Sequence, residues 1–318
     1  MNRKQFSEDT YKTLLFLIEH PEFKDKIGTA LIQRTFRIGY GRAADVIDEL
    51  CECKIIERPT VKGIGSYCTL LVSLDEIRKI LEPQSEGLTM IEKIENYKGK
   101  VLPIVGRPGI GQESVALQIA LEYTKFTSKS VLIFSPIQPK REIQMRLVSI
   151  RDGYNYYWAK SRTLSQQTIE RFNGYVRGMD FSQPSVDDTE DISEEYIINR
   201  ISNTEDIGMV VMLDFDFYSE KVSVAFLRMV AEQMQIPIVV SCLVQREVDD
   251  RDDCHPRRED MRSSDLAKMD TVLLVYRESY YDLDCIDMTT ELLVDRGETK
   301  EVVMLRYNRN RIMFYTIK

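Results

Sequence analysis

The feature that most constrains the fold is a glycine-rich stretch, GRPGIGQES at residues 106–114, set between an apolar run and a helical pattern. VLPIV precedes it and VALQIALEY follows it. A strand, a glycine-rich turn and a helix start are the setting of a phosphate-binding loop, whose pattern is G-x-x-x-x-G-K-[ST]. Gln112 stands at the lysine position and Glu113 at the hydroxyl position. The residues expected to contact a nucleotide are Gly106, Gly109, Gly111, Gln112, Glu113 and Ser114.

After this stretch, apolar runs alternate with helical patterns. Strands are expected at 130–134, 209–213, 236–241 and 271–276, and two more, TELLVDR and EVVMLRY, near the end. Continuous β-branched runs joined by helices indicate a mainly parallel sheet with helices on both faces. The last two runs add an antiparallel hairpin at one edge. The predicted fold class is α/β.

Length and composition allow more than one domain. The chain has 318 residues, of which 43% are hydrophobic and 30% charged, as is ordinary for a globular protein. No apolar run approaches the ~20 residues of a membrane span. The start, MNRKQFSEDTYK, lacks the apolar core of a secretory signal. We therefore expect a cytoplasmic protein with no membrane partner.

Charge is unevenly distributed along the chain. The net charge is −8; residues 1–80 contain 13 Lys+Arg and 12 Asp+Glu, so the rest, with 30 and 39, carries −9. This acidic part of the chain is expected to bind the phosphate backbone of nucleic acids poorly in general. Any contact with nucleic acid should therefore be local.

Residues 1–80 predict three short helices and a hairpin. Apolar residues recur at helical spacing over 10–19, 29–36 and 41–54, and the turn RIGY precedes the third helix. IIERP and SYCTLLVSL, joined through VKGIG, predict a two-stranded ribbon. This order is that of a winged helix-turn-helix, whose third helix can enter a DNA major groove. The residues expected on the inner face of that helix are Ala44, Ile47, Leu50 and Cys51.

The segment ALIQRTFRIGYGRAADVIDELCECKIIE resembles the gamma domain of FtsK-type DNA translocases, which carries LIQR-x-x-RIGY-x-RAA before an apolar helix. The resemblance implies sequence-specific binding of duplex DNA. Where the family usually has a second basic residue after RAA, this chain has Asp45, with Asp48 and Glu49 following. These carboxylates repel phosphates, so either the affinity is modest or the partner is a protein. The DNA-binding residues assigned are Gln33, Arg34, Arg37, Tyr40 and Arg42, with Lys62 in the ribbon turn.

A polar joint separates this segment from the rest. The helical pattern from residue 76 ends at Pro83, and Gln-Ser-Glu-Gly follows. We expect a winged-helix domain at 1–80, a linker at 81–97 and an α/β domain at 98–318.

The α/β segment resembles the C-terminal RecA-like domain of DnaB-type replicative helicases. The matching pieces, in order, are GRPGIG, VLIFSPIQPKREIQMRL, VDDTEDI, VVMLDFDF, LRMVAEQMQIPIVVS and MDTVLLVYR, followed by a strand pair. They cover nearly all of 98–318. The resemblance implies a RecA-like sheet and subunits that pack in rings, with each nucleotide site at a subunit boundary.

Several catalytic parts implied by that family are missing. Hydrolysis needs charge on the phosphates, a metal and a polarised water. Gln112 and Glu113 replace the lysine and the hydroxyl, and Ile137 stands where the family's water-polarising glutamate lies. The family's polar glutamine becomes Phe217, and its S-Q pair becomes Cys242-Leu243. The sequence therefore predicts a degenerate NTPase domain.

Two remnants survive. Asp214 ends the VVMLD strand where the family's magnesium-associated aspartate lies, and Arg296 stands at the arginine-finger position, with Val294 in place of the family's lysine. Asp214 is the only metal ligand assigned. Since the glycine loop and helix N-terminus still favour an anion, weak binding of ATP and magnesium is the only cofactor interaction expected.

The stretch 246–265 corresponds to the family's flexible strand-contacting loop. It holds five arginines and eight carboxylates, a poor electrostatic groove for single-stranded DNA. A solvated surface loop is an equal alternative, and Arg257-Arg258 is the best remaining candidate for a DNA contact.

Three functions remain open. The favoured one is a DNA-binding adaptor for replication or DNA processing, whose inactive helicase-type domain docks on RecA-like partners, either other copies or a helicase. The second is a divergent but active DNA-dependent ATPase or helicase using Glu113, Asp214 and Arg296. The third is an oligomeric regulator of transcription or replication.

Overall fold

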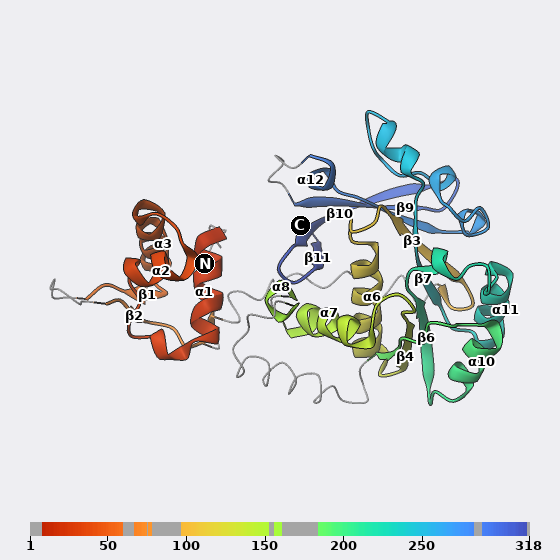
Figure 1. The fold of residues 1–318 in the computed structure, drawn as a ribbon, viewed down its shortest axis with the longest axis horizontal. Coiled ribbons are helices and arrows are strands. Elements are labelled where there is room, and N and C mark those ends of the chain that lie inside the picture. The colour runs from red at the N-terminus through yellow and green to blue at the C-terminus, as the bar shows by residue number, and fades with distance from the viewer. Residues whose placement is uncertain are drawn as a thin grey trace. The chain divides into compact units, whose positions relative to one another are not determined.

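The computed structural model describes residues 8–59, 67–74, 76–77, 97–152, 156–160, 184–282 and 288–316. The chain divides into two compact units, residues 1–84 and 85–318. The first is red to orange in Figure 1 and the second yellow to blue. Lys62 and nearly all of the expected linker, 81–96, lie outside the described residues.

The first unit has the predicted order of helices and strands. The helices are α1 (Glu8–Glu19), a 3-10 turn η1 (Pro21–Phe23), α2 (Thr29–Phe36) and α3 (Tyr40–Glu52). A two-residue ribbon, β1 (Ile56–Glu57) with antiparallel β2 (Thr69–Leu70), follows. The turn between α2 and α3 begins at Arg37, which takes the left-handed conformation (φ 54°).

The inner face of α3 differs by about one residue from the prediction. The buried residues are Ala43, Val46, Ile47 and Leu50, whereas Ala44 and Cys51 are only half-buried. Both sets have spacings of three and four, so helical periodicity fits either. The packing against Leu14, Leu17 and Ile32 selects the first set.

The second unit is built on one twisted sheet. Within the described residues the sheet has nine strands in the order β11-β10-β9-β8-β3-β7-β6-β4-β5. The strands from β8 to β5 are parallel, and β9, β10 and β11 add antiparallel partners at one edge. The bounds are β3 (Val101–Gly106), β4 (Ser130–Phe134), β5 (Ser185–Asp187), β6 (Ile207–Met212), β7 (Ile238–Leu243), β8 (Val272–Tyr276), β9 (Thr289–Asp295), β10 (Lys300–Asn308) and β11 (Met313–Thr316).

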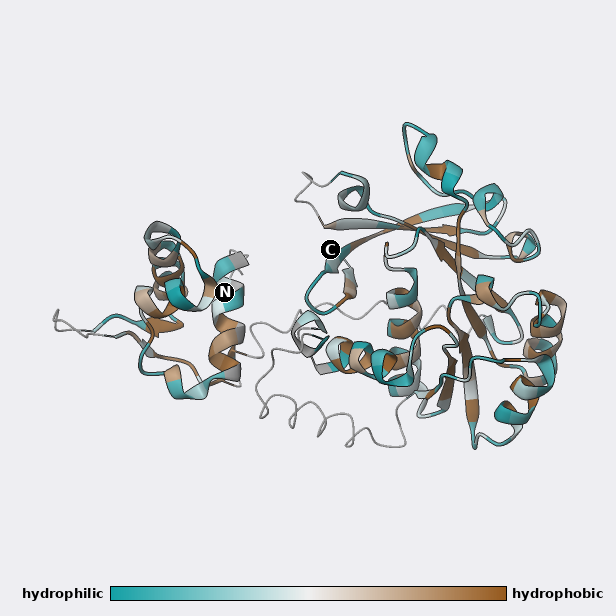
Figure 2. Ribbon diagram, in the orientation of Figure 1, coloured by the Kyte–Doolittle hydropathy of each residue, from teal (hydrophilic) through white to brown (hydrophobic). Residues whose placement is uncertain are grey.

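Helices cover both faces of this sheet. One core joins α6 (Gln112–Thr127) and α7 (Lys140–Asp152) to the sheet, and the other joins α10 (Glu194–Ser202) and α11 (Val224–Met234). Two short helices complete the unit: α8 (Tyr156–Lys160) contacts α7, and α12 (Glu278–Tyr281) contacts β9. Figure 2 shows the hydrophobic colouring concentrated along the strands and on the helix sides toward them. The predicted α/β class with a mainly parallel, helix-covered sheet is confirmed.

Two strands lie outside the predicted set, β5 and β11. β5 has three residues and β11 only four, which is too short for a distinct apolar run. Among the described helices, none combines the length and apolar character that crossing a bilayer requires.

Candidate functional site

The glycine loop keeps the backbone shape that the sequence predicts. It connects β3 to α6, and Gly109 and Gly111 have positive φ values of 81° and 125°. A Cβ on Gly111 would lie 2.4 Å from Cζ of Phe314, a residue of β11. Side chains other than hydrogen are therefore excluded at Gly111 both by backbone conformation and by the strand that packs behind it.

Gln112 turns back onto the loop instead of reaching outward. Its side chain is 2% exposed, and its Oε1 accepts a hydrogen bond from the backbone N–H of Gly111 at 3.3 Å. Backbone N–H groups of such a loop are the usual donors to phosphate oxygens. In this chain one of them is thus already occupied by the residue that replaces the lysine.

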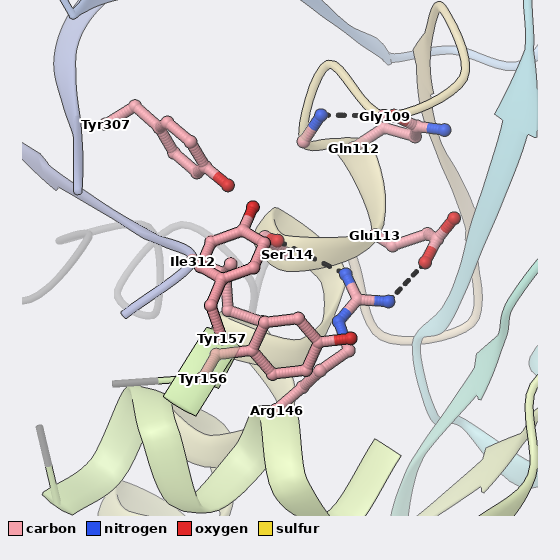
Figure 3. Close-up of a pocket in the computed structure, with 10 residues that line it drawn as sticks. Gly109, Gln112, Glu113, Ser114, Arg146, Tyr156, Tyr157, Tyr307 and Ile312 are labelled. Atoms are coloured by element: carbon pink, nitrogen blue, oxygen red, sulfur yellow. Dashed lines mark hydrogen bonds and ion pairs between the residues drawn. The ribbon is translucent and has the colours of Figure 1, made fainter. Parts of the chain in front are cut away.

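Arg146 of α7 provides the positive charge in this site. Its guanidinium forms an ion pair with Glu113 and donates to Ser114 Oγ at 3.2 Å and to Gln138 Oε1 at 3.0 Å. Figure 3 shows it between Glu113 and Ser114. The side chains of Arg146 and Glu113 are only 10% and 17% exposed. A buried charge pair of this kind requires such additional hydrogen bonds.

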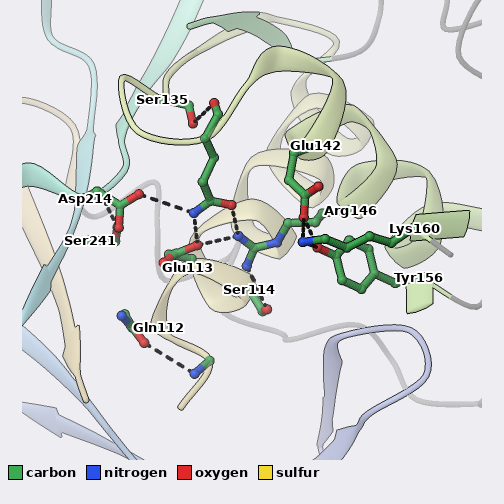
Figure 4. A network of polar contacts seen from close by, with 12 residues as sticks. Gln112, Glu113, Ser114, Ser135, Glu142, Arg146, Tyr156, Lys160, Asp214 and Ser241 are labelled. Atoms are coloured by element: carbon green, nitrogen blue, oxygen red, sulfur yellow. Dashed lines mark hydrogen bonds and ion pairs between the residues drawn. The ribbon is translucent and has the colours of Figure 1, made fainter. Parts of the chain in front are cut away.

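Gln138 connects this pair to Asp214. Its Nε2 donates to Glu113 Oε2 at 2.7 Å and lies 3.3 Å from Asp214 Oδ2. Figure 4 shows Glu113, Arg146 and Asp214 in this network. The neighbouring Ile137 is 51% exposed. The resemblance places Ile137 at the position of the family's polarising glutamate; in this structure the side chain that enters the network is that of Gln138. A neutral amide cannot act as a general base.

Asp214 follows the last residue of β6, Met212, by two positions. Its backbone is left-handed (φ 54°), and its N–H donates to Ser241 Oγ at 3.0 Å. Burial, and then the charge of Glu113, raise the pKa of Asp214 from its ordinary value of 3.8 to about 7. Glu113 shows the opposite result: burial acts to raise its pKa, but Arg146 and the hydrogen bonds from Gln138 hold it below its usual value. One negative charge, on Glu113, is therefore favoured over two.

A pocket of about 200 Å³ opens beside this network. Its aromatic wall is made by Tyr156, Tyr157 and Tyr307. Behind Tyr307, the guanidinium carbon of Arg277 lies 4.2 Å from the ring centroid. The volume is below the roughly 300–1,000 Å³ of typical ligand sites. The remaining lining residues are Gly109, Gly111, Gln112, Glu113, Ser114, Arg146 and Ile312.

The arrangement does not fit a magnesium triphosphate. Glu113 places a carboxylate in the first turn of α6, where a phosphate would lie, and Gln112 supplies no charge there. The only carboxylate near Glu113 in the described network, Asp214, is held near neutrality because a second negative charge is disfavoured. To admit phosphates, Arg146 would have to leave Glu113, which would leave the carboxylate uncompensated.

Arg296 lies away from this site. It follows β9, which is antiparallel to β8, whereas β8 runs parallel to β3. The β9–β10 turn therefore lies at the opposite ends of the strands from the glycine loop. There Arg296 pairs with Glu301 at 3.4 Å. Val294 is 2% exposed. Within one copy, Arg296 and the glycine loop are thus not brought together.

The stretch 246–265 is folded onto the sheet edge. It contains the short 3-10 turns η4 (Arg246–Asp250) and η5 (Arg258–Asp260). Arg258 donates to Asp295 Oδ1 at 2.7 Å and to the Met269 carbonyl at 2.6 Å. Its side chain is 19% exposed. Arg258 therefore has a structural role, and the predicted Arg257-Arg258 pair is reduced to Arg257 as an outward-facing cation.

The predicted DNA-binding residues of the first unit lie on α2, its end and the first turn of α3. Arg34, Arg37, Tyr40 and Arg42 are exposed, Tyr40 at 67%, and Gln33 is half-buried. Arg42 donates through Nε (2.8 Å) and Nη2 (2.6 Å) to the same oxygen of Asp9 in α1. The Asp9 carboxylate holds Arg42 in a position where its side chain remains 65% exposed.

Sequence reasoning missed Gln138 and Arg146 of the network and the side chains that complete the pocket wall: Tyr156, Tyr157, Tyr307 and Ile312. Arg146 could have been found from its own helix, because it stands among residues that are buried on both sides of it, Met145 and Leu147. An arginine inside such a run requires a buried partner. Tyr307 and Gln138 carry no such signal, since β10 and the turn after β4 are otherwise ordinary.

Comparison with known families agrees with this architecture. The model of the DnaB-like helicase C terminal domain matches residues 92–315, and that of the FtsK gamma domain matches residues 22–63. The first match covers well over half of the chain. The chain therefore belongs to the DnaB-like helicase C-terminal domain family.

Individual relatives are distant replicative helicases. Replicative DNA helicase DnaC of Bacillus subtilis is 23% identical over 276 residues, covering 77% of this chain and 61% of the helicase. Replicative DNA helicase DnaB of Geobacillus stearothermophilus is 22% identical, again over 77% and 61%. The chain thus spans about three fifths of the length of these relatives.

Solved structures share the fold. A solved ATPase domain superposes with a TM-score of 0.61 at 19% identity, covering 77% of this chain and 99% of that domain. A DnaB-like replicative helicase, studied for its interactions with primase, gives the same TM-score at 17% identity over 96% of this chain and 78% of that one. At these identities the likeness concerns the RecA-like fold alone.

Proposed function

We propose that this chain is a DNA-binding protein whose helicase-type domain does not hydrolyse nucleotides and instead docks on RecA-like partners during replication or DNA processing. Family membership supports a replication-related role. The first unit would find duplex DNA, and the second would bring it to a partner subunit.

The observation that carries this proposal is the closed network around Glu113. Arg146, Gln138 and Ser114 satisfy one another and the Glu113 carboxylate. Gln112 meanwhile caps the Gly111 N–H. A live site of this type must release such groups to phosphate, metal and water. Here the release would expose a buried, unpaired charge, so any nucleotide is expected to bind weakly and without turnover.

DNA binding is proposed for the first unit through the exposed residues Arg34, Arg37, Tyr40 and Arg42. They lie in one continuous stretch across the end of α2 and the start of α3, the segment that a helix-turn-helix directs to the groove. Lys62 is proposed as a wing contact. Asp45 and Asp48, exposed beyond the first turn of α3, restrict this contact to the start of the helix.

One observation favours an active enzyme as the second candidate. The pKa of Asp214, about 7, is near the value that suits a general base or acid at neutral pH. With Arg146 as the cation in the same subunit and Arg296 from a neighbour, a rebuilt site would hydrolyse ATP in the presence of DNA. A purely regulatory oligomer is the third candidate, and it would bind DNA without a helicase partner.

ATP turnover by the full-length chain, with and without DNA, tests the proposal. We expect no turnover above that of Asp214→Ala, because Arg146 and Gln138 hold the Glu113 carboxylate and Gln112 supplies no charge to a bound phosphate. Gln112→Lys should not restore turnover either, since a lysine alone supplies no general base. Turnover that Asp214→Ala abolishes would establish the enzyme instead, and turnover in Gln112→Lys would show that the general base is present.

A further inference from the structure

Two cysteine side chains meet inside the first unit. Cys51 lies in the last turn of α3, and Cys68 comes directly before β2. Both thiols are free, and a hydrogen bond joins them. Cys68 is 6% exposed and belongs to the core of the unit, against which the half-buried Cys51 packs. The DNA-binding role proposed above makes no use of this pair.

Backbone hydrogen bonds hold the segments that carry the two thiols. The N–H of Cys68 donates to the Ile27 carbonyl at 2.7 Å, and the Cys68 carbonyl accepts from the Ile27 N–H at 3.2 Å. Shortly after Cys51, the Ile55 N–H donates to the Leu50 carbonyl at 3.0 Å. The thiols therefore meet because the fold keeps the two segments together. A bond between two side chains that already touch requires little movement of the backbone.

Burial makes both thiols slow to react. It raises the pKa of Cys51 and of Cys68, although the nearby charge of Arg58 acts in the opposite direction on Cys68. Because a thiol reacts as its thiolate, the pair stays reduced until an oxidant is present. Cys51 is half-buried whereas Cys68 is buried, so an oxidant from solvent reaches Cys51 first. The Cys51 sulfur, once oxidised, already lies against the Cys68 thiol.

We propose that Cys51 and Cys68 form a redox site, at which hydrogen peroxide converts the two thiols to a reversible disulfide. The Cys51 sulfur attacks one peroxide oxygen, the O–O bond breaks, and Cys51 becomes a sulfenic acid as one water leaves. The Cys68 sulfur then attacks the Cys51 sulfur, and the hydroxyl leaves with the Cys68 proton as a second water. In total the two thiols lose two electrons, and the peroxide gains them.

The disulfide would connect the end of α3 directly to the ribbon. A cross-link of this kind removes conformations from the unfolded chain and so stabilises the segments that it joins. Oxidation would thus hold α3, whose first turn is proposed above to contact DNA, more firmly against β2. The disulfide itself forms between two thiols of one chain and requires neither DNA nor a partner, so its test is independent of the proposed function.

Peptide mapping of the full-length chain after treatment with millimolar hydrogen peroxide tests the proposal. The remaining thiols are alkylated before digestion. We expect a linked peptide pair that contains Cys51 and Cys68, and recovery of both thiols with dithiothreitol. Cys51→Ala and Cys68→Ala should each abolish the linked pair. Cys53→Ala, two residues from Cys51, is the matched control and should form the link as the wild type does.

A second measurement uses the wild type alone, so it does not depend on how the variants fold. Hydrogen–deuterium exchange should be slower after oxidation at peptides containing Ile55 and Leu71, whose N–H groups bond the end of α3 to the ribbon. Dithiothreitol should reverse this change. Absence of the Cys51–Cys68 link from the oxidised wild type, a Cys51–Cys53 link in its place, or faster exchange at these peptides would overturn the proposal.

Discussion

Two arginine–carboxylate pairs, one in each unit, look alike in contact distance but differ in their surroundings. Arg146 and Glu113 are 10% and 17% exposed and make three further hydrogen bonds with Gln138 and Ser114. Arg42 pairs with a mostly buried Asp9, yet its own side chain is 65% exposed. The first cation is enclosed by protein, whereas the second is accessible from solvent.

The difference determines what each arginine can exchange. Removing a partner from a buried pair leaves an uncompensated charge and costs about 3–5 kcal/mol, whereas an exposed pair contributes only about 0–1 kcal/mol. Arg146 is therefore held by Glu113, and a phosphate cannot displace that carboxylate cheaply. Arg42 can accept a DNA phosphate at little cost. Similar pairs thus differ in how easily their arginine can exchange its carboxylate for another anion.

The largest effect is expected from breaking the buried pair. Arg146→Ala should lower the free energy of unfolding by about 3–5 kcal/mol, because Glu113 would remain buried without its cation. Denaturant unfolding followed by circular dichroism measures this. The double variant Glu113→Gln/Arg146→Met removes both charges and should recover most of the loss. Wild-type stability in Arg146→Ala would mean that Glu113 is hydrated or neutral in the folded chain.

A smaller effect is expected from pH. Since the pKa of Asp214 rises from 3.8 to about 7 on folding, the unfolded chain releases this proton at lower pH than the folded chain does. Stability should therefore fall as pH rises through about 4 to 7, by a few kcal/mol at most. Unfolding at about pH 5 and about pH 8 measures the slope, and Asp214→Asn should flatten it. A slope that is the same in Asp214→Asn would locate the pH dependence elsewhere.

The smallest effect concerns the exposed pair and its neighbour. Arg42→Ala and Arg37→Ala should each weaken duplex binding by the full-length chain about three- to tenfold, and each should reduce the slope of log affinity against log salt by about 0.9. Fluorescence anisotropy with a labelled duplex measures both quantities. Arg228→Ala, at an exposed position of α11 in the other unit, is the matched control. Unchanged affinity in both variants would remove DNA binding from the first unit.

The architecture follows from residues whose signal is local and strong. The run VLPIV, the spacing of Gly106 and Gly111, and the alternation of apolar strands with helices are enough to predict a helix-covered parallel sheet. The placement of Asp214 after a strand follows from the same reasoning, because the apolar run MVVML before it predicts a buried strand. These features depend on backbone preference and burial, which act over short stretches of chain.

The site could be predicted only in part, because its contacts join distant segments. Gln112 lies where the loop predicts, but its turn back onto Gly111 depends on side-chain rotamers. Arg146 is 33 residues from Glu113, and no pattern in the sequence pairs them. The choice between Ile137 and Gln138 depends on which side chain faces inward after a strand, and periodicity ends with the strand.

The last strand of the sheet has a consequence for engineering this chain. Gln118 of α6 donates to the Phe314 carbonyl and accepts from its N–H, both at 2.8 Å. Phe314 in turn packs onto Gly111. A deletion of β11 would therefore also affect the glycine loop. It would leave a cavity beside Gly111, and the amide oxygen and nitrogen of Gln118 would be buried without partners. Fusion tags and truncations are safer at the other terminus, because there they leave the contacts of Phe314 with Gln118 and Gly111 intact.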